Sequence, residues 1–169
     1  DLNEFKISKS LRKEIKRERF NIKNNSSFEK VIRLCAKNQF RETSWINEQI
    51  IDNYIKLNKL GFAKSIECFE DNKLVGGLYG IIVGKIFCGE SMFSVKTNAS
   101  KVALTYLATL LRQAGFLYID TQFYSEHLKQ FGTKKISKKK YQEILSMNNN
   151  IRKLKFPDKL KHPLKDYFK

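Results

Sequence analysis

The sequence has few cysteines and histidines and no long apolar run, so it has little from which to build a disulfide framework, a metal site or a membrane span. Its 169 residues include three cysteines, two histidines and two prolines. No apolar run reaches the roughly 18 residues of a membrane span, and no apolar stretch follows the basic residues near the N-terminus, as it does in a secretory signal. We therefore expect a cytoplasmic protein that has no membrane partner.

The cysteines are Cys35, Cys68 and Cys88, which stand far apart in the sequence among apolar neighbours. An odd, unclustered set fits neither a disulfide framework nor the ligand spacing of a zinc site. We interpret all three as buried, reduced thiols, and we expect no metal ion and no cofactor.

Acidic residues are also scarce, and the excess of basic residues is uneven. There are 17 acidic and 33 basic side chains, which give a net charge of +16. The net charge is +6 over residues 1–37, zero over residues 38–128 and +10 over residues 129–169. Cationic ends around a neutral middle indicate attraction to a polyanion. A lysine-rich source genome is the alternative explanation, which the sequence leaves open.

The chain does have enough apolar residues, 41% with 12% aromatic, for one folded domain. Periodicity and turn residues predict helices over residues 8–20, 28–35, 47–61, 98–115, 125–132 and 137–145, and strands over residues 63–70, 74–83, 86–93 and 116–121. Residues 26–29 resemble a capping box, Asn47 and Asn98 are expected N-caps, and residues 39–44 form a polar link. An antiparallel meander, a crossover helix and a parallel strand predict a mixed α/β domain over residues 1–146. Residues 147–169 are expected to form an extended, basic C-terminal tail.

The two strands over residues 74–93 form a predicted hairpin with a carboxylate inside it. They are joined at Gly84-Lys85, and Glu90 stands in the second, otherwise apolar strand. A carboxylate in that position either has a partner or binds a ligand, because burying it alone is costly. The glycines in these strands allow a ligand or another backbone to approach closely.

A second polar pair ends the predicted strand over residues 116–121. Asp120 and Gln122 are two residues apart, so both point to one face together with Tyr118. Ligands in open α/β sheets bind at the carboxyl ends of strands, where this carboxylate can orient and polarise the carboxamide. The alternative is that the pair only caps the helix that begins at Ser125.

The N-terminal helix places Leu11 and Ile15 on one face and cationic residues on the others. Such a density of charge is typical of a solvated face and also of a surface that contacts nucleic-acid phosphates. The candidate contact residues are Lys9, Arg12, Lys13, Lys16 and Arg17.

Four motifs, in their order and spacing, resemble the leucyl/phenylalanyl-tRNA-protein transferases. They are GGLYG at residues 76–80, FCGESMF at residues 87–93, NASK at residues 98–101 and the strand LYIDTQ that ends in Gln122. The resemblance implies an acetyltransferase-like fold with a mixed, mainly antiparallel sheet flanked by helices. It also implies a monomeric aminoacyltransferase that moves Leu or Phe from aminoacyl-tRNA to the N-terminal Arg or Lys of acceptor proteins and marks them for degradation.

The resemblance further implies a role for each candidate residue. Gln122 relays the proton of the attacking amine, Asp120 orients Gln122, and Glu90 binds a polar group of the aminoacyl-adenosine end or the cationic acceptor. The N-terminal helix meets the tRNA acceptor stem. The implied pocket residues for the amino acid are Trp45, Leu78, Phe87, Met92, Leu104, Leu107, Leu111 and Ile119. On sequence alone the aliphatic members are ordinary core positions, and Trp45 is equally a hydrophobic staple before its helix.

The chain departs from the family pattern in several places. The usual additional N-terminal portion is absent, and Leu stands at positions 78, 107 and 111, where Met and aromatic residues are common, so the pocket is expected to differ in shape. Ser125 replaces the usual Asn.

Two rival functions remain open. A coenzyme A dependent N-acetyltransferase needs a glycine-rich pyrophosphate loop, yet residues 94–100 contain no glycine. An RNA-binding module without a reaction fits the cationic ends, but it leaves Glu90, Asp120 and Gln122 without a role.

Overall fold

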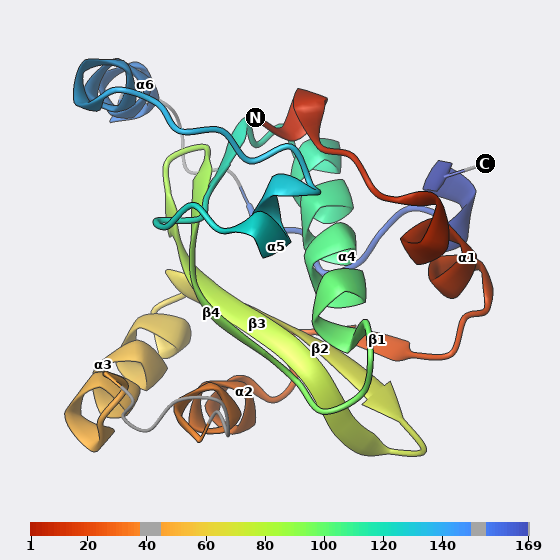
Figure 1. Cartoon of the computed structure of the whole chain (residues 1–169). Coiled ribbons are helices and arrows are strands. Elements are labelled where there is room, and N and C mark those ends of the chain that lie inside the picture. The colour runs from red at the N-terminus through yellow and green to blue at the C-terminus, as the bar shows by residue number, and fades with distance from the viewer. Residues whose placement is uncertain (38–44, 150–154, 169) are drawn as a thin grey trace.

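One five-stranded sheet with helices on both faces organises the chain (Figure 1). The computed structural model describes residues 1–37, 45–149 and 155–168, so the link expected over residues 39–44 lies outside the described residues. The strands are β1 (Asn21–Asn24), β2 (Ala63–Glu70), β3 (Lys73–Val83), β4 (Ile86–Ser94) and β5 (Tyr118–Asp120). The helices are α1 (Lys9–Lys16), α2 (Phe28–Ala36), α3 (Glu48–Lys59), α4 (Ala99–Gln113), α5 (Glu126–Lys129) and α6 (Lys138–Asn149), with 3-10 helices η1 (Leu2–Glu4) and η2 (Leu164–Phe168).

The strand order is β1-β2-β3-β4-β5, with antiparallel pairing up to β4 and a parallel pair between β4 and β5. The α4 helix connects these last two strands, because a parallel neighbour requires a crossover. The predicted mixed α/β class and the order of meander, helix and parallel strand are therefore confirmed.

The core lies on both faces of the sheet. Helix α4 packs on one face against β2 and β3, while α2 and α3 cover the other face (Figure 1). Leu104, Leu107 and Leu111 of α4 are at most 5% exposed. Burying one such side chain contributes about 1.5–3 kcal/mol, so this helix is a main source of stability.

Strand β1 was not among the predicted strands. It has four residues with one apolar side chain, Ile22, and pairs antiparallel with β2 through Ile22 and Cys68. A segment this short and polar lacks the alternating pattern of a strand, and only the free edge of β2 gives it a partner.

The prediction of an extended C-terminal tail is wrong for residues 155–168. The ring of Phe156 lies 6.3 Å from that of Phe87 and 6.4 Å from that of Phe116, and Leu164 is also buried. The Asn24 side-chain amide donates to the Pro157 carbonyl at 2.6 Å. The overall polarity of the segment hides the few apolar residues that anchor it to the core.

The predicted capping box at the start of α2 is also wrong. Ser27 is the N-cap, but its side chain makes no capping hydrogen bond. The fully buried carboxylate of Glu67 on β2 instead accepts hydrogen bonds from the Ser26 and Ser27 backbone N–H groups at 3.1 and 3.3 Å, and from the Ser65 hydroxyl at 2.5 Å. The Glu67 carboxylate of β2 thus accepts hydrogen bonds from backbone N–H groups at the N-terminus of α2.

The other two expected N-caps have different outcomes. Asn47 accepts from the Ile50 N–H at 2.9 Å, as predicted. Asn98 occupies the N-cap of α4, but its backbone is left-handed, with φ of 68°, and its side chain makes no capping bond.

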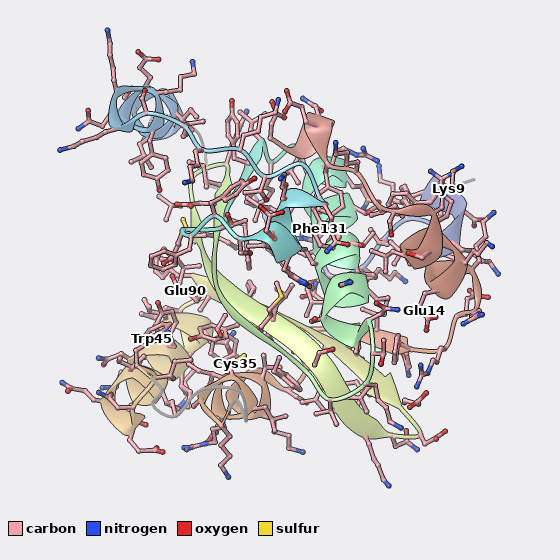
Figure 2. The ribbon with its side chains drawn as sticks, viewed as in Figure 1. Lys9, Glu14, Cys35, Trp45, Glu90 and Phe131 are labelled. Carbon is pink, nitrogen blue, oxygen red and sulfur yellow. The ribbon has the colours of Figure 1, made fainter. Side chains whose placement is uncertain are left out.

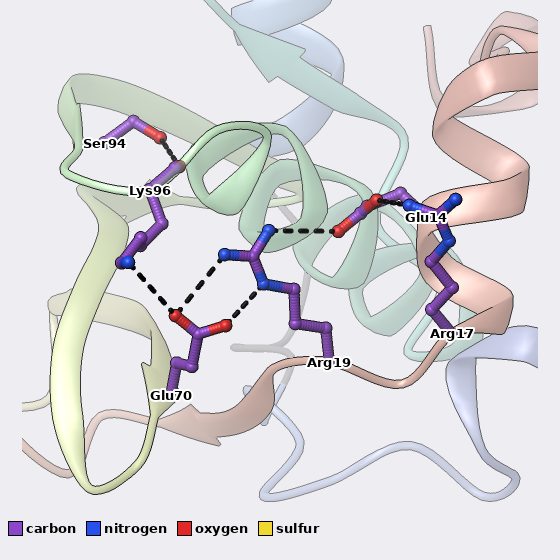
Figure 3. Close-up of polar contacts among 6 residues, drawn as sticks. All are labelled: Glu14, Arg17, Arg19, Glu70, Ser94 and Lys96. Atoms are coloured by element: carbon purple, nitrogen blue, oxygen red, sulfur yellow. Dashed lines mark hydrogen bonds and ion pairs between the residues drawn. The ribbon is translucent and has the colours of Figure 1, made fainter.

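A polar network joins α1 to the end of β2 (Figure 3). Glu14 pairs with Arg17 at 3.1 Å and with Arg19 at 3.7 Å, and Arg19 also binds Glu70 through two nitrogens. Lys96 lies 3.8 Å from Glu70. Glu14 is buried and Glu70 is partly buried, whereas the cations that pair with them are more exposed. The network therefore gives the buried Glu14 carboxylate its charged partners and links α1 to the end of β2.

The three cysteines are free and buried, as predicted. Burial raises the pKa of Cys35 and Cys68 to about 12 and the pKa of Cys88 to about 11. Thiols with raised pKa values stay protonated near neutral pH and are poor nucleophiles.

We expect the Gly80→Ala variant to be less stable by about 1–3 kcal/mol, because a Cβ atom there meets the Cys88 carbonyl oxygen at 2.2 Å and the Phe87 ring at 2.6 Å. Urea unfolding measures the change. Gly89→Ala is the matched control, since its Cβ meets nothing closer than the Asp120 carbonyl oxygen at 3.5 Å. Equal loss of stability in both variants would contradict the packing around Gly80.

We also expect an aromatic disulfide reagent at about pH 8 to leave all three thiols of the folded protein unmodified. That pH lies below all three raised pKa values, so the thiolate fraction is small and burial blocks access. Absorbance of the released thiolate should report three reactive groups after unfolding in denaturant. Rapid reaction of one thiol in the folded protein would show that its burial is wrong.

Candidate active site

A cleft of about 1040 Å³ opens at the carboxyl end of β5. The β4–β5 ladder ends at the pair Cys88 and Asp120, while β4 continues to Ser94 paired with β3. The cleft is lined by η1, the end of β5, α5, the start of α6 and the loops between them. It therefore lies along the edge strand β5 and past its carboxyl end, and the carboxyl ends of strands are where ligands bind in this class of sheet.

Asp120 ties three parts of the cleft together. One carboxylate oxygen accepts the Gln122 backbone N–H at 2.8 Å, and the other accepts the Tyr141 hydroxyl of α6 at 2.7 Å. The hydrogen bond to Asp120, followed by burial, raises the pKa of Tyr141 above its ordinary value. Tyr141 had no role in the sequence analysis, because its contact with Asp120 depends on how α6 folds back over β5.

Gln122 stands exposed beside Asp120 with a left-handed backbone, at φ of 58°. A non-glycine residue adopts that conformation at a cost, which the bond from its N–H to Asp120 helps to offset. Asp120 thus contacts the backbone of Gln122, where the sequence analysis expected it to contact the carboxamide. The alternative that Asp120 caps α5 is wrong, because Ser125 accepts the Leu128 N–H itself at 3.3 Å.

Alternating side chains of β5 face opposite sides of the sheet. Ile119 packs into the core beside α4, whereas Tyr118 packs with Ile86 and Ile144 towards α6. Asp120 faces the same way as Tyr118, since it reaches Tyr141 on α6. The shared face predicted for Tyr118 and Asp120 is confirmed.

The structure brings four of the predicted site residues to the cleft: Asp120, Gln122, Leu104 and Ile119. The other predicted aliphatic and aromatic pocket residues on this side of the sheet lie in the packed core and do not line the cleft. They are Leu78, Phe87, Leu107 and Leu111, all at most 3% exposed, and Met92, which is partly buried against the same core.

Glu90 and Trp45 lie on the α3 side of the sheet (Figure 2). Glu90 is the extra residue of a β-bulge, since Tyr79 pairs with Ser91 and Gly80 pairs with Gly89. A bulge redirects a side chain, and here the half-buried Glu90 carboxylate is close enough to the Tyr54 hydroxyl to interact with it. Burial, followed by the charge and hydrogen bond of Glu90, raises the pKa of Tyr54 above its usual range.

Trp45 is 47% exposed and is not the hydrophobic staple of α3. Ile46 and Ile51, which flank the Asn47 N-cap at the staple positions, share one buried cluster. The staple interpretation of Trp45 is therefore wrong, and its indole ring remains accessible at the surface.

The predicted tRNA-contact residues of α1 are exposed but do not line the cleft. Arg17 pairs with Glu14, whereas the described residues provide no carboxylate partner for Lys9, Arg12, Lys13 or Lys16. A second group of cations does line the cleft, namely Lys134, Lys135, Lys138 and Lys140. The signal that points to this group is the run of lysines over residues 134–140.

Across residues 1–37, 45–149 and 155–168, no group of three or more His, Cys, Asp or Glu side chains is arranged to hold a metal ion. No helix in the described parts of the chain combines the length and apolar character needed to cross a bilayer.

Comparison with known proteins gives consistent matches over most of the chain. The family model described as leucyl/phenylalanyl-tRNA protein transferase matches residues 1–146. The leucyl/phenylalanyl-tRNA–protein transferase of Paramagnetospirillum magneticum is 49% identical over 146 residues, which are 86% of this chain and 70% of that protein. The transferase of the same name from Maricaulis maris is 46% identical over 146 residues, which are 86% and 68% of the two chains.

Similar solved structures are more distant. An aminoglycoside acetyltransferase from an uncultured soil metagenomic sample has a TM-score of 0.48 and 14% identity, covering 86% of this chain and 99% of that chain. The PaiA N-acetyltransferase of Thermoplasma acidophilum has a TM-score of 0.41 and 13% identity, covering 57% and 76%. From the family model and the sequence relatives, the chain belongs to the leucyl/phenylalanyl-tRNA protein transferase family.

Proposed function

We propose that the chain transfers Leu or Phe from aminoacyl-tRNA to the N-terminal Arg or Lys of acceptor proteins. The observation that carries the proposal is the cleft in which Asp120 and Gln122 lie beside Leu104 and Ile119, in a member of this family. The proposal includes a monomer that works in the cytoplasm and marks its acceptors for degradation.

The reaction joins an amine to an ester that is already activated. The lone pair of the acceptor α-amine attacks the ester carbonyl carbon, a C–N bond forms, and the bond from carbon to the ribose oxygen of tRNA breaks. The proton lost by the amine ends on the departing ribose oxygen. Such a reaction requires positioning and proton handling more than a covalent intermediate on the protein.

Gln122 is the proposed contact for the attacking amine. Its carboxamide oxygen is too weak a base to hold the proton, so its role is to accept an N–H hydrogen bond and pass the proton onward. Asp120 and Tyr141 hold the backbone of Gln122 in place, which keeps the exposed carboxamide at the cleft. Tyr141 acts through Asp120 and is therefore a positioning residue.

The amino acid side chain is proposed to enter the cleft beside Leu104 and Ile119. Leu78, Phe87, Met92, Leu107 and Leu111 lie in the core that supports these two residues. The size of these core residues sets the depth of the apolar part of the cleft, and so influences whether Leu or Phe fits it better.

Two charged regions are proposed to hold the substrates. Glu90, half-buried where β4 separates from β5, binds the cationic side chain or the amine of the acceptor, and Trp45 walls the aminoacyl end from the same side. The α1 cations Lys9, Arg12, Lys13, Lys16 and Arg17 contact acceptor-stem phosphates. The pairing of Arg17 with Glu14 makes Arg17 the weakest contributor of the five.

We expect Gln122→Ala to lower kcat by about 100-fold or more, the usual contribution of positioned proton transfer, with little change in KM for tRNA. Incubation with labelled leucyl-tRNA and a peptide that begins with Arg, followed by counting label on the peptide, measures the rate. Gln142→Ala, an exposed glutamine on α6, is the matched control. An unchanged rate in Gln122→Ala would remove this residue from the mechanism, and no transfer by the parent chain would favour the RNA-binding module.

We expect Tyr141→Phe to lower kcat by about 10-fold. The variant loses one hydrogen bond to a charged group, and such a bond contributes roughly 1.5 kcal/mol to holding Asp120 in place. The same transfer assay measures kcat, and a thermal melt measures stability. Tyr167→Phe is the control, since it also loses a hydroxyl bond, to Gln113 at 2.9 Å, away from the cleft. Equal kcat in the two variants, or a loss explained by unfolding, would show that Tyr141 is only structural.

A further inference from the structure

The segment over residues 133–141, TKKISKKKY, borders the cleft, and its lysines have no assigned role. It contains five lysines and no acidic residue. We name the lysines Lys134, Lys135, Lys138, Lys139 and Lys140 the lysine rim. All five are exposed, and four of them line the cleft.

Three of the five rim lysines have no carboxylate partner among the described residues. Lys134 pairs with Glu4 at 2.6 Å, and Lys140 pairs with Glu143 at 3.4 Å. Within the described ranges no carboxylate neutralises Lys135, Lys138 or Lys139, so their charges are available to an anion.

The carboxylates that line the cleft are already engaged. Asp1 accepts the Asn3 N–H at 2.8 Å, Glu4 pairs with Lys134, and Asp120 binds Gln122 and Tyr141. These interactions leave the lysine rim as the dominant charge at the mouth of the cleft. A concave surface of one sign concentrates ligands of the opposite charge.

Exposed aromatic residues stand between the lysines and the catalytic pair. Phe123 is 80% exposed, directly after Gln122, and the Lys135 ammonium lies 5.2 Å from the centre of the Tyr124 ring. Exposed rings beside unpaired cations are typical of surfaces that bind single-stranded nucleic acid, where bases stack and phosphates meet lysines. A duplex keeps its bases stacked inside and offers nothing to these rings.

The lysine rim is separate from the α1 surface. Figure 1 shows α1 and α6 at opposite ends of the molecule, with α4 between them. Two surfaces so far apart would meet different parts of a large polyanion, and of the two it is the lysine rim that lines the cleft with Asp120 and Gln122.

We propose that the lysine rim, with Phe123 and Tyr124, binds the unpaired 3′ nucleotides of tRNA and guides the esterified end towards Gln122. The proposal rests on the proposed function for its choice of nucleic acid. The rim lysines contact phosphates without regard to sequence, and the two rings stack on bases.

The test compares binding of two uncharged RNAs, an intact tRNA and the same tRNA from which the unpaired 3′ nucleotides have been removed. The rim variant combines Lys135→Ala, Lys138→Ala and Lys139→Ala. The α1 variant combines Arg12→Ala, Lys13→Ala and Lys16→Ala, and a control combines Lys56→Ala, Lys59→Ala and Lys73→Ala, all exposed and outside the cleft. Fluorescence anisotropy over a range of salt concentrations gives Kd and its salt dependence.

We expect the rim variant to bind intact tRNA at least 10-fold more weakly, with a salt slope smaller by about 2, because each lost phosphate contact on a single strand removes about 0.7 from the slope. On the shortened tRNA the rim variant should match the parent chain, whereas the α1 variant should be weaker on both RNAs. An equal loss on both RNAs, or a loss no greater than that of the control, would overturn the proposal.

Failure of the proposed function gives a different result, because this assay uses no charged tRNA and no acceptor. A parent chain that transfers nothing but binds intact tRNA through the rim would refute the transferase proposal and leave the rim standing. A rim variant that still transfers the amino acid and binds tRNA with unchanged affinity would refute only the proposal that the lysine rim binds the 3′ nucleotides.

Discussion

The candidate site depends on the carboxylate of Asp120, the last residue of the β4–β5 ladder. Pairing with β4 fixes the backbone of Asp120. Its two carboxylate oxygens accept hydrogen bonds from the Gln122 backbone N–H and from the Tyr141 hydroxyl of α6. Three segments that are separated along the chain are thereby held around one cleft. Without that carboxylate, the unusual backbone of Gln122 loses its hydrogen-bond partner, and α6 keeps the apolar packing of Ile144 but loses its polar contact with β5.

The charge distribution acquires a structural meaning in this arrangement. The neutral middle of the chain builds β2 to β5 and α4, the rigid part that positions the reacting groups. The cationic ends form two separate surfaces, one on α1 and one along the lysine rim (Figure 1). Because phosphate contacts act over several ångströms and need little geometric order, they suit peripheral segments, whereas the chemistry needs the sheet.

Most regular elements follow from local pattern, and the exceptions have a common cause. The hairpin of β3 and β4, the buried helix α4 and the Asn47 cap were predicted from alternation, helical period and turn residues. Strand β1 and the packed segment over residues 155–168 were not, because each is held by a distant partner and has little signal of its own. The same holds for Glu67 of β2. Its carboxylate accepts from the Ser26 and Ser27 N–H groups at the start of α2, in place of the expected capping box.

The sequence by itself determined the α/β class, the placement of Asp120 and Gln122 at a strand end, and the presence of two cationic regions. These features depend on neighbours in the chain, on periodicity and on composition. Only the tertiary structure decided that Asp120 holds the Gln122 backbone, that Tyr141 completes this contact, and that Leu104 and Ile119 reach the cleft while Phe87 stays in the core. Such contacts join residues whose separation along the chain carries no information about their distance in space, so they appear only when the elements pack.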